Sequence, residues 1–172
     1  MIKAPIPPDE EDRLAALHAL LILDTPPEER FDRIVDFMAA EFDVPVALIT
    51  LVERDRVWFK SKFGLAACDA ARDTSFCGHA IVEPGLFVVP DMLQDSRFAD
   101  HPMVLGEPGL RMYAGAPLLL RSGHVAGMLC MNDTRVRDFD DLDYAILFSL
   151  RDLVVAELEA APHTEAAEQR RD

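Results

Sequence analysis

The sequence predicts an α+β domain, in which an antiparallel sheet has terminal helices on one face and long loops over the other. Three observations support this fold class. Helical patterns stand at both ends of the chain, apolar runs typical of strands lie between them, and a long irregular segment separates those runs. Since two of the expected strands are apolar on both faces, both faces of the sheet must be covered, and we expect a pocket under the loops.

The N-terminal part contains two helix patterns. In the first, Asp9 can cap a helix whose apolar residues between positions 14 and 23 fall near helical spacing. The second starts at Thr25, followed by prolines that a first helical turn tolerates, and Glu28 completes a capping box. The stripe expected to be buried on the second helix consists of Phe31, Ile34, Val35, Met38 and Phe42.

Two strand patterns follow these helices. Residues 44–52 are apolar on both alternating faces, which is typical of a central strand covered on both sides. Residues 56–63 alternate instead, with Arg56, Lys60 and Lys62 on one face. An outward row of lysines is typical of an exposed edge strand, because charge discourages pairing with another chain.

The middle of the chain, residues 64–109, is largely irregular. It contains a short helix pattern at 76–82 and a short strand pattern at 86–89. So much irregular chain within a compact domain is typical of functional loops. Residues 112–120 and 124–131 then predict a hairpin.

The C-terminal part predicts one closing helix. It spans residues 140–161, with an apolar stripe of Leu142, Ile146, Leu150 and Leu153. Within the preceding hairpin, Pro117 favours an edge or a bulge. We expect a single domain over residues 1–172, with its core at about 10–160 and a frayed tail over 162–172.

Composition excludes several classes of protein. The 172 residues carry 17 Lys and Arg against 31 Asp and Glu, a formal net charge of −14 that would repel nucleic acid and anionic membrane surfaces. No apolar run reaches the ~18 residues of a membrane span, and the start lacks a signal-peptide core. Three cysteines, Cys68, Cys77 and Cys130, fit a reducing compartment. We therefore expect a cytoplasmic protein.

Three groups of segments stand in a fixed order along the chain. They are residues 11–24 with 27–31 and 44–49; residues 59–61 and 64–65 with Asp73-Thr74-Ser75-Phe76-Cys77-Gly78-His79-Ala80-Ile81; and residues 89–91 and 95–98 with Arg111-Met112-Tyr113-Ala114-Gly115-Ala116-Pro117-Leu118. Together they resemble the GAF domain family, in the bacterial branch found singly or ahead of histidine kinases and diguanylate cyclases. The resemblance implies a profilin-like sheet of about six antiparallel strands, a small-molecule or regulatory pocket, and signalling through the terminal helices, but it identifies no ligand.

The predicted pocket lies between the sheet and the loops of residues 64–109. In Phe76-Cys77-Gly78-His79, the thiol and the imidazole either contact a ligand or pack in the core with backbone partners. Arg111 either holds an anionic ligand or pins the loops by pairing with an aspartate. The predicted ligand-binding residues are Phe59, Phe76, Cys77, His79, Asp91, Arg111 and Tyr113.

We predict no catalytic residue, no cofactor and no metal. The Cys-x-His of residues 77–79 lacks a second ligand pair at a recognisable spacing, so zinc is not expected. GAF domains that bind bilins carry a Cys-His pair, which this sequence lacks. The signature of cyclic-nucleotide GAF domains is matched only in part, at Asn132-Asp133, Phe139 and Asp143-Tyr144.

Two alternative functions come from other classes. One is a GAF-fold enzyme that reduces free methionine sulfoxide with thiols, since Cys68 and Cys77 are loosely similar to two cysteines of that family. Its attacking cysteine should then lie between Asp91 and Pro108, where this sequence has none, and Cys130 falls in a strand, where an inert thiol is usual. The other alternative is a dimerisation scaffold without a ligand.

The sequence thus favours a non-catalytic sensory or regulatory domain. We expect it to bind an unidentified small molecule and to signal through its terminal helices or a partner protein. Val154 and Val155 widen the apolar surface of the closing helix, which indicates a homodimer. Neither nucleic acid nor a membrane is expected as a partner.

Overall fold

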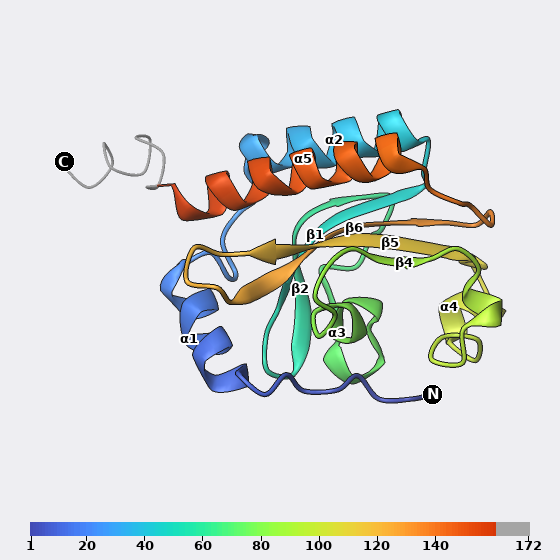
Figure 1. Cartoon of the computed structure of the whole chain (residues 1–172), viewed down its shortest axis with the longest axis horizontal. Coiled ribbons are helices and arrows are strands. Elements are labelled where there is room, and N and C mark those ends of the chain that lie inside the picture. Colours follow the sequence, from blue (N-terminus) through green and yellow to red (C-terminus); the bar gives the residue numbers. More distant parts are fainter. Residues whose placement is uncertain (161–172) are drawn as a thin grey trace.

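The centre of the fold is one antiparallel sheet. The computed structural model describes residues 1–160. In that part of the chain the strands are β1 (Val46–Val52), β2 (Arg56–Phe63), β3 (Asp69–Ala71), β4 (Phe87–Val89), β5 (Met112–Leu119) and β6 (Val125–Asp133). They form a six-stranded sheet in the order β3-β2-β1-β6-β5-β4, and every neighbouring pair is antiparallel (Figure 1). The predicted fold class and strand number are therefore confirmed.

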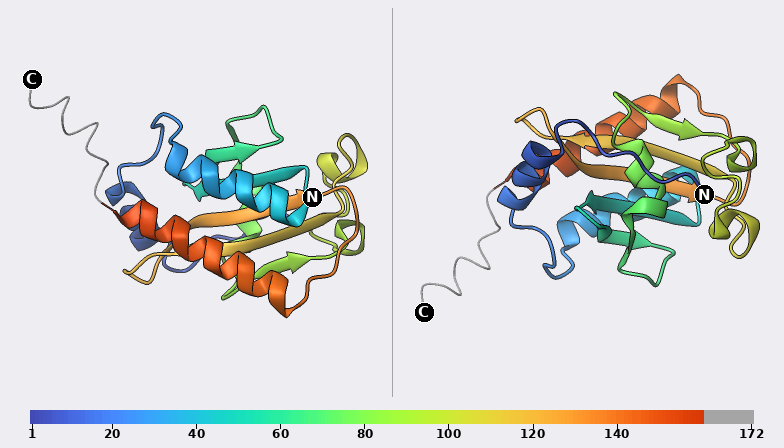
Figure 2. Two further views of the ribbon diagram at one scale, coloured as in Figure 1. Left: turned by 90° about the horizontal axis from the view of Figure 1, so that it is seen from above. Right: turned by 90° about the horizontal axis from the view of Figure 1, so that it is seen from below.

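Helices cover the sheet on both sides. They are α1 (Glu10–Ala19), α2 (Glu29–Phe42), α3 (Phe76–Ala80), α4 (Pro102–Leu105) and α5 (Asp141–Glu159), with short 3₁₀ turns η1 (Arg72–Thr74) and η2 (Met92–Gln94). The long helices α2 and α5 lie side by side over one face (Figure 2, left), and α1 packs near the start of β6. The other face is covered by α3, α4 and the N-terminal segment (Figure 2, right).

Alternation along β1 explains why two layers of cover are needed. Ala47, Ile49 and Leu51 pack into the core under α2 and α5, while Val46 and Leu48 pack into a second core on the side of α3. All seven residues of β1 are buried. The prediction of a strand covered on both faces is therefore confirmed, and β6, its neighbour, has the same property.

The predicted hairpin of β5 and β6 is also confirmed. Its turn contains Gly123 with φ +89°, a left-handed conformation that glycine adopts without strain. Pairing between the two strands slips between Pro117 and Leu119. Because proline cannot donate to the sheet, the irregularity falls where the sequence predicts a bulge.

Both predicted helix caps are wrong. Asp9 makes no capping bond, and its Oδ2 instead lies 2.8 Å from Nδ1 of His124. The second helix begins at Glu29 without a side-chain cap, and Thr25 lies before it in the connecting loop. Glu28 leaves the expected capping box because its carboxylate pairs with Lys60, 2.7 Å away.

The prediction that residues 56–63 form an edge strand is also wrong. β3 pairs with the first half of β2 and takes the edge position. Lys60 is 3% exposed rather than outward-facing. Its Nζ donates to Thr25 Oγ1 and to the carbonyl oxygen of Pro26, in addition to the ion pair with Glu28. The acceptors come from the loop before α2, which the alternation within one strand cannot reveal.

The buried stripe of α5 differs from the prediction. The residues that pack on the sheet are Leu147, Leu150, Val154 and Leu158. Leu142 and Leu153 are 67% and 54% exposed, and Ile146 is half-buried. α5 ends at Glu159, and the predicted tail of residues 162–172 lies outside the described residues. None of the helices within residues 1–160 is long and apolar enough to cross a membrane.

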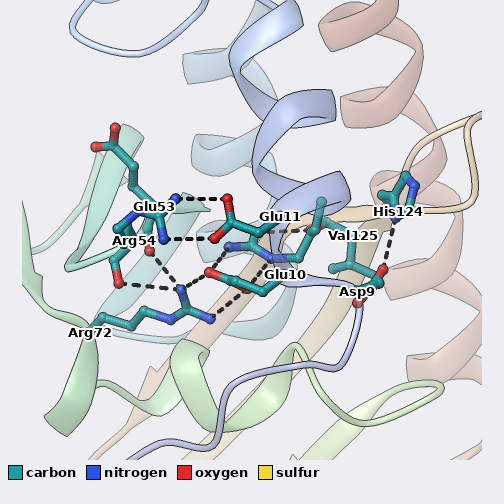
Figure 3. A network of polar contacts seen from close by, with 9 residues as sticks. Asp9, Glu10, Glu11, Glu53, Arg54, Arg72, His124 and Val125 are labelled. Carbon is teal, nitrogen blue, oxygen red and sulfur yellow. Dashed lines mark hydrogen bonds and ion pairs between the residues drawn. The ribbon is translucent and has the colours of Figure 1, made fainter.

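A buried group of charges fastens the N-terminal helix to the sheet and to η1 (Figure 3). The Glu10 carboxylate accepts from Arg13 Nε at 2.9 Å and from Arg72 Nη2 at 3.1 Å. Two donors also reach backbone: Arg13 Nη1 donates to the carbonyl oxygen of Val125, and Arg72 Nη1 to that of Glu53. The buried Nε of Arg72 has no hydrogen-bond partner within residues 1–160. One carboxylate thus bridges two buried guanidinium groups, and backbone carbonyl oxygens accept further hydrogen bonds from both of them.

Glu10→Gln is expected to lower the free energy of unfolding by about 3 kcal/mol, because two buried guanidinium groups lose their counter-charge. The matched control is Glu11→Gln, since the neighbouring Glu11 makes an exposed ion pair with Arg54. Exposed pairs contribute little, so urea denaturation should leave this control near the wild type. Equal losses in the two variants would contradict the role given to Glu10.

The difference in stability between the wild type and Glu10→Gln should also depend on pH. Burial acts to raise the pKa of Glu10, but hydrogen bonds from Arg72 and Arg13 outweigh it and lower this pKa from 4.5 to about 2. Because the folded-state pKa lies below the unfolded one, the stabilisation is complete above about pH 4.5 and is lost as the pH falls towards 2. The stability gap between wild type and Glu10→Gln should narrow over that range, and a constant gap would argue against the network.

Candidate functional site

A cavity of about 160 Å³ lies between the sheet and α3. Strands β1, β2, β3, β5 and β6 contribute its floor, and η1, α3 and the start of α4 contribute its roof. On β1, the alternate residues Val46, Leu48 and Thr50 face the cavity. The strand period of two therefore selects which half of β1 lines it.

The roof is seated closely against the rest of the protein. Ser75 caps α3, and its Oγ accepts from the backbone N–H of Gly78 at 2.9 Å. A Cβ at Gly78 would lie 2.7 Å from the carbonyl oxygen of Arg72 and 2.9 Å from Cβ of Ala4. The N-terminal segment crosses α3 at this point, where Ala4 N donates to the carbonyl oxygen of Asp73 at 2.9 Å (Figure 2, right).

The wall of the cavity is neutral. No Asp, Glu, Lys or Arg side chain of the described chain lines it, and most of the lining is aliphatic or aromatic. The polar groups include Thr50, Asn132 and His101. Burial lowers the pKa of His101, whose Nε2 lies 3.0 Å from the carbonyl oxygen of Thr74, so this imidazole is neutral at physiological pH. Such a wall favours an uncharged ligand over a phosphate or carboxylate.

Two thiols and a phenol meet at the cavity. Sγ of Cys77 on α3 lies 3.6 Å from Sγ of Cys130 on β6 and 3.2 Å from the hydroxyl of Tyr113 on β5. The hydrogen bond from Cys130 lowers the pKa of the Cys77 thiol and correspondingly raises the pKa of Cys130. Burial raises the pKa of Tyr113, so the phenol stays protonated.

Four of the predicted ligand-binding residues line the cavity: Phe59, Phe76, Cys77 and Tyr113. Phe76 is the centre of an aromatic group, with ring centroids 4.6 Å from His101 and 5.9 Å from Tyr113. These contacts place the aromatic side chains in the wall and hold α3 and α4 to the sheet.

The other three predicted residues do not line the cavity. Arg111 donates from Nε and Nη2 to the two carboxylate oxygens of Asp91, at 2.9 Å each. The hydrogen bond from Arg111 holds the pKa of Asp91 below its usual range. This ion pair ties the segment before β5 to the loop that contains Asp91, as expected from the interpretation in which Arg111 pairs with an aspartate. His79 packs its ring edge-on against Phe98, and its Nε2 lies 3.0 Å from the carbonyl oxygen of Ile2.

Sequence reasoning missed several residues of the wall, among them Leu48, Leu110, His101, Asn132 and Cys130. For β6 the signal was present, since Cys130 and Asn132 share a strand face by alternation. Their approach to α3 had no signal in the sequence because it depends on packing between distant segments. Within residues 1–160, no group of three or more His, Cys, Asp and Glu side chains is placed to hold a metal ion.

Comparison with known proteins decides the family. The model of the GAF domain family matches residues 26–158. The chain belongs to the GAF domain family. This GAF domain is 38% identical over 159 residues to a cyclic di-GMP phosphodiesterase of Pseudomonas aeruginosa, a match that covers 92% of the chain. The chain spans only 27% of the length of that relative.

Solved structures of other GAF domains share the fold. The GAF domain of a phosphoenolpyruvate-protein phosphotransferase from Coxiella burnetii matches with a TM-score of 0.65 at 14% identity, over 92% of this chain and 98% of that one. The free methionine-R-sulfoxide reductase of Neisseria meningitidis, solved in complex with its substrate, matches with a TM-score of 0.62 at 18% identity, over 87% of each chain. At these identities the likeness shows the fold alone.

Gly78→Ala is expected to lower the free energy of unfolding by about 1–2 kcal/mol, because the new methyl group meets the Arg72 carbonyl and Ala4 in a closely packed place. Gly85→Ala is the control, since a Cβ there meets nothing within 4 Å. Thermal and urea unfolding of both variants test the seating of the roof. A Gly78→Ala protein as stable as wild type would contradict it.

Proposed function

We propose that this GAF domain is a non-catalytic sensory or regulatory unit that binds a small neutral molecule in the cavity between the sheet and α3. The observation that carries the proposal is the neutral, largely apolar wall of a 160 Å³ space. An apolar cavity of about 150 Å³ in another protein binds benzene, so a ligand of this size class has room here. The cavity also favours ligand binding over a scaffold without a ligand.

The curated relative supports a role in bacterial signalling. Its name assigns it cyclic di-GMP phosphodiesterase activity, and this chain corresponds to about a quarter of its length. We place the GAF domain as a regulatory unit in a system of that kind, acting on a partner protein through its terminal helices. Cyclic di-GMP itself is not the ligand we propose, because its two phosphates would need cationic partners that the described wall does not offer.

The thiol-reductase alternative has weaker support. Cys68 is exposed, and its Sγ lies 3.6 Å from Lys62 Nζ, whereas Cys77 is buried at the cavity. The two cysteines that resemble those of the reductases therefore have different environments. No cysteine stands between Asp91 and Pro108, where that family would place its attacking thiol.

Ligand binding is tested with benzene and indole as probes, followed by NMR of the methyl and amide groups. Ala70→Leu on β3 places three added carbons at the wall and should weaken probe binding by about tenfold or more. Ala71→Leu is the matched control, because the adjacent Ala71 is exposed and its side chain points to the opposite face of the strand. It should bind the probes as wild type does.

Two results would overturn this assignment. One is a set of probe-induced shifts that survives Ala70→Leu unchanged. The other is cyclic di-GMP producing saturable shifts at the cavity residues, which would show that the wall accepts a charged nucleotide.

We also propose that the domain forms a homodimer through the outer side of α5. Val154, one of the two valines on which the sequence-based expectation rests, is buried against the sheet and does not widen the outer surface. Leu142 and Leu153 lie on nearly the same outer side of the helix and are exposed, and exposed apolar groups of this kind mark interaction surfaces. Leu153→Asp should convert the dimer to a monomer in light scattering, without loss of folding. Leu119→Asp, at a 48% exposed leucine of β5, should stay dimeric. A wild-type monomer at micromolar concentration would contradict the proposal.

A further inference from the structure

The two buried thiols form a pair that the proposed function does not use. Cys77 lies on α3 in the roof and Cys130 on β6 in the floor, and their sulfur atoms are 3.6 Å apart. A disulfide needs a separation of about 2.05 Å, so the sulfurs must approach by about 1.6 Å. This approach falls mainly on α3, because β6 is held in the sheet by β1 and β5.

We propose that Cys77 and Cys130 are a site of oxidative modification, at which a small hydroperoxide converts the two thiols to a disulfide across the cavity. The pair differs from the one that the reductase resemblance implies, which involves Cys68 and Cys77. The proposal also goes beyond ligand sensing, since it requires only the two thiols and the oxidant.

The surroundings of the pair fit this chemistry. Both cysteines line the cavity, so a molecule inside it can reach either sulfur. The cavity wall includes the partly exposed residues Phe59, Leu65 and Thr74, which extend it to the protein surface. Hydrogen peroxide is neutral and close to water in size, and no charged side chain of the described wall opposes its entry.

The hydrogen bonds assign different roles to the two thiols. The thiolate is the nucleophile in such oxidations, and a thiolate at Cys77 can accept hydrogen bonds from Cys130 and from the hydroxyl of Tyr113. Cys77 is therefore the attacking residue. Cys130, the neighbour that keeps its proton, is the resolving residue.

The reaction balances in two steps. The Cys77 thiol gives up its proton, the resulting thiolate attacks the terminal peroxide oxygen, and the O–O bond breaks. Cys77 becomes a sulfenic acid, and the other oxygen leaves with the proton that Cys77 gave up, as an alcohol or as water. The sulfur of Cys130 then attacks the sulfenic sulfur, the S–S bond forms, the S–O bond breaks, and the departing hydroxide takes the proton of Cys130 to give water. Two thiols lose two electrons and two protons, and the hydroperoxide accepts them.

The experiment uses the reduced 172-residue chain treated with hydrogen peroxide, then unfolded and labelled with N-ethylmaleimide. Three cysteines are free before oxidation, so the disulfide leaves one label in the wild type, and none in Cys68→Ser. Intact mass should fall by the two hydrogens lost, and peptide mapping should show Cys77 joined to Cys130. A thiol reductant should restore the labels.

The control variants separate the proposal from its rivals. Cys130→Ser should form no internal disulfide and should leave Cys77 as a sulfenic acid that dimedone traps. Cys68→Ser changes an exposed position and keeps the test decisive if Cys130→Ser does not fold. The proposal fails if Cys77 and Cys130 both keep their labels at peroxide levels that oxidise Cys68. It fails equally if the crosslink joins Cys68 to Cys77. Either failure leaves the binding of benzene or indole untouched, so the two proposals are judged separately.

Discussion

Strands β1 and β6 must be kept from water on both faces, and the rest of the domain is arranged to meet that requirement. On one side, α2 and α5 supply large apolar stripes that pack on the sheet. On the other side the cover is made of short pieces: α3, α4, two 3₁₀ turns and the N-terminal segment. The cavity of about 160 Å³ lies between these short elements and the sheet.

Charged side chains hold this cover in place from its outer side. Arg72 reaches Glu10 beside η1, Arg111 pairs with Asp91, and Arg97 pairs with Asp95. Each of these guanidinium groups has a carboxylate partner within or beside the loops, and none of them lines the cavity. The neutral wall is thus a consequence of how the roof is fastened, and it determines the class of molecule that the cavity accepts.

The periodic parts of the sequence predicted the fold well. The alternation of apolar residues predicted β1 and the hairpin of β5 and β6. Helical spacing predicted α2 and the apolar stripe that this helix buries. Predictions failed where a partner lies far away along the chain. Lys60 belongs to a charged pattern in β2, but its side chain is buried and forms an ion pair with Glu28, which precedes α2. In α5 the stripe is set by contact with the sheet, which selects Leu147 and Val154 over their neighbours.

Only part of the site was accessible to the same reasoning. Phe59, Phe76, Cys77 and Tyr113 lie in segments that the GAF resemblance marks, and all four reach the cavity. Arg111 and Asp91 carry the residue types of an anion site, yet each has the other as its partner. The approach of Cys130 to Cys77 joins residues 53 positions apart and follows from the packing of α3 on the sheet.

On the face of the sheet opposite α2 and α5, the neutral and largely apolar cavity has room for a small molecule. A crystal structure under xenon pressure tests it most directly, because xenon enters apolar cavities without needing a specific ligand. We expect a xenon atom between Leu48, Phe76 and Cys130, with α3 in the position described above. Side chains collapsed into that space, with no xenon bound, would contradict it.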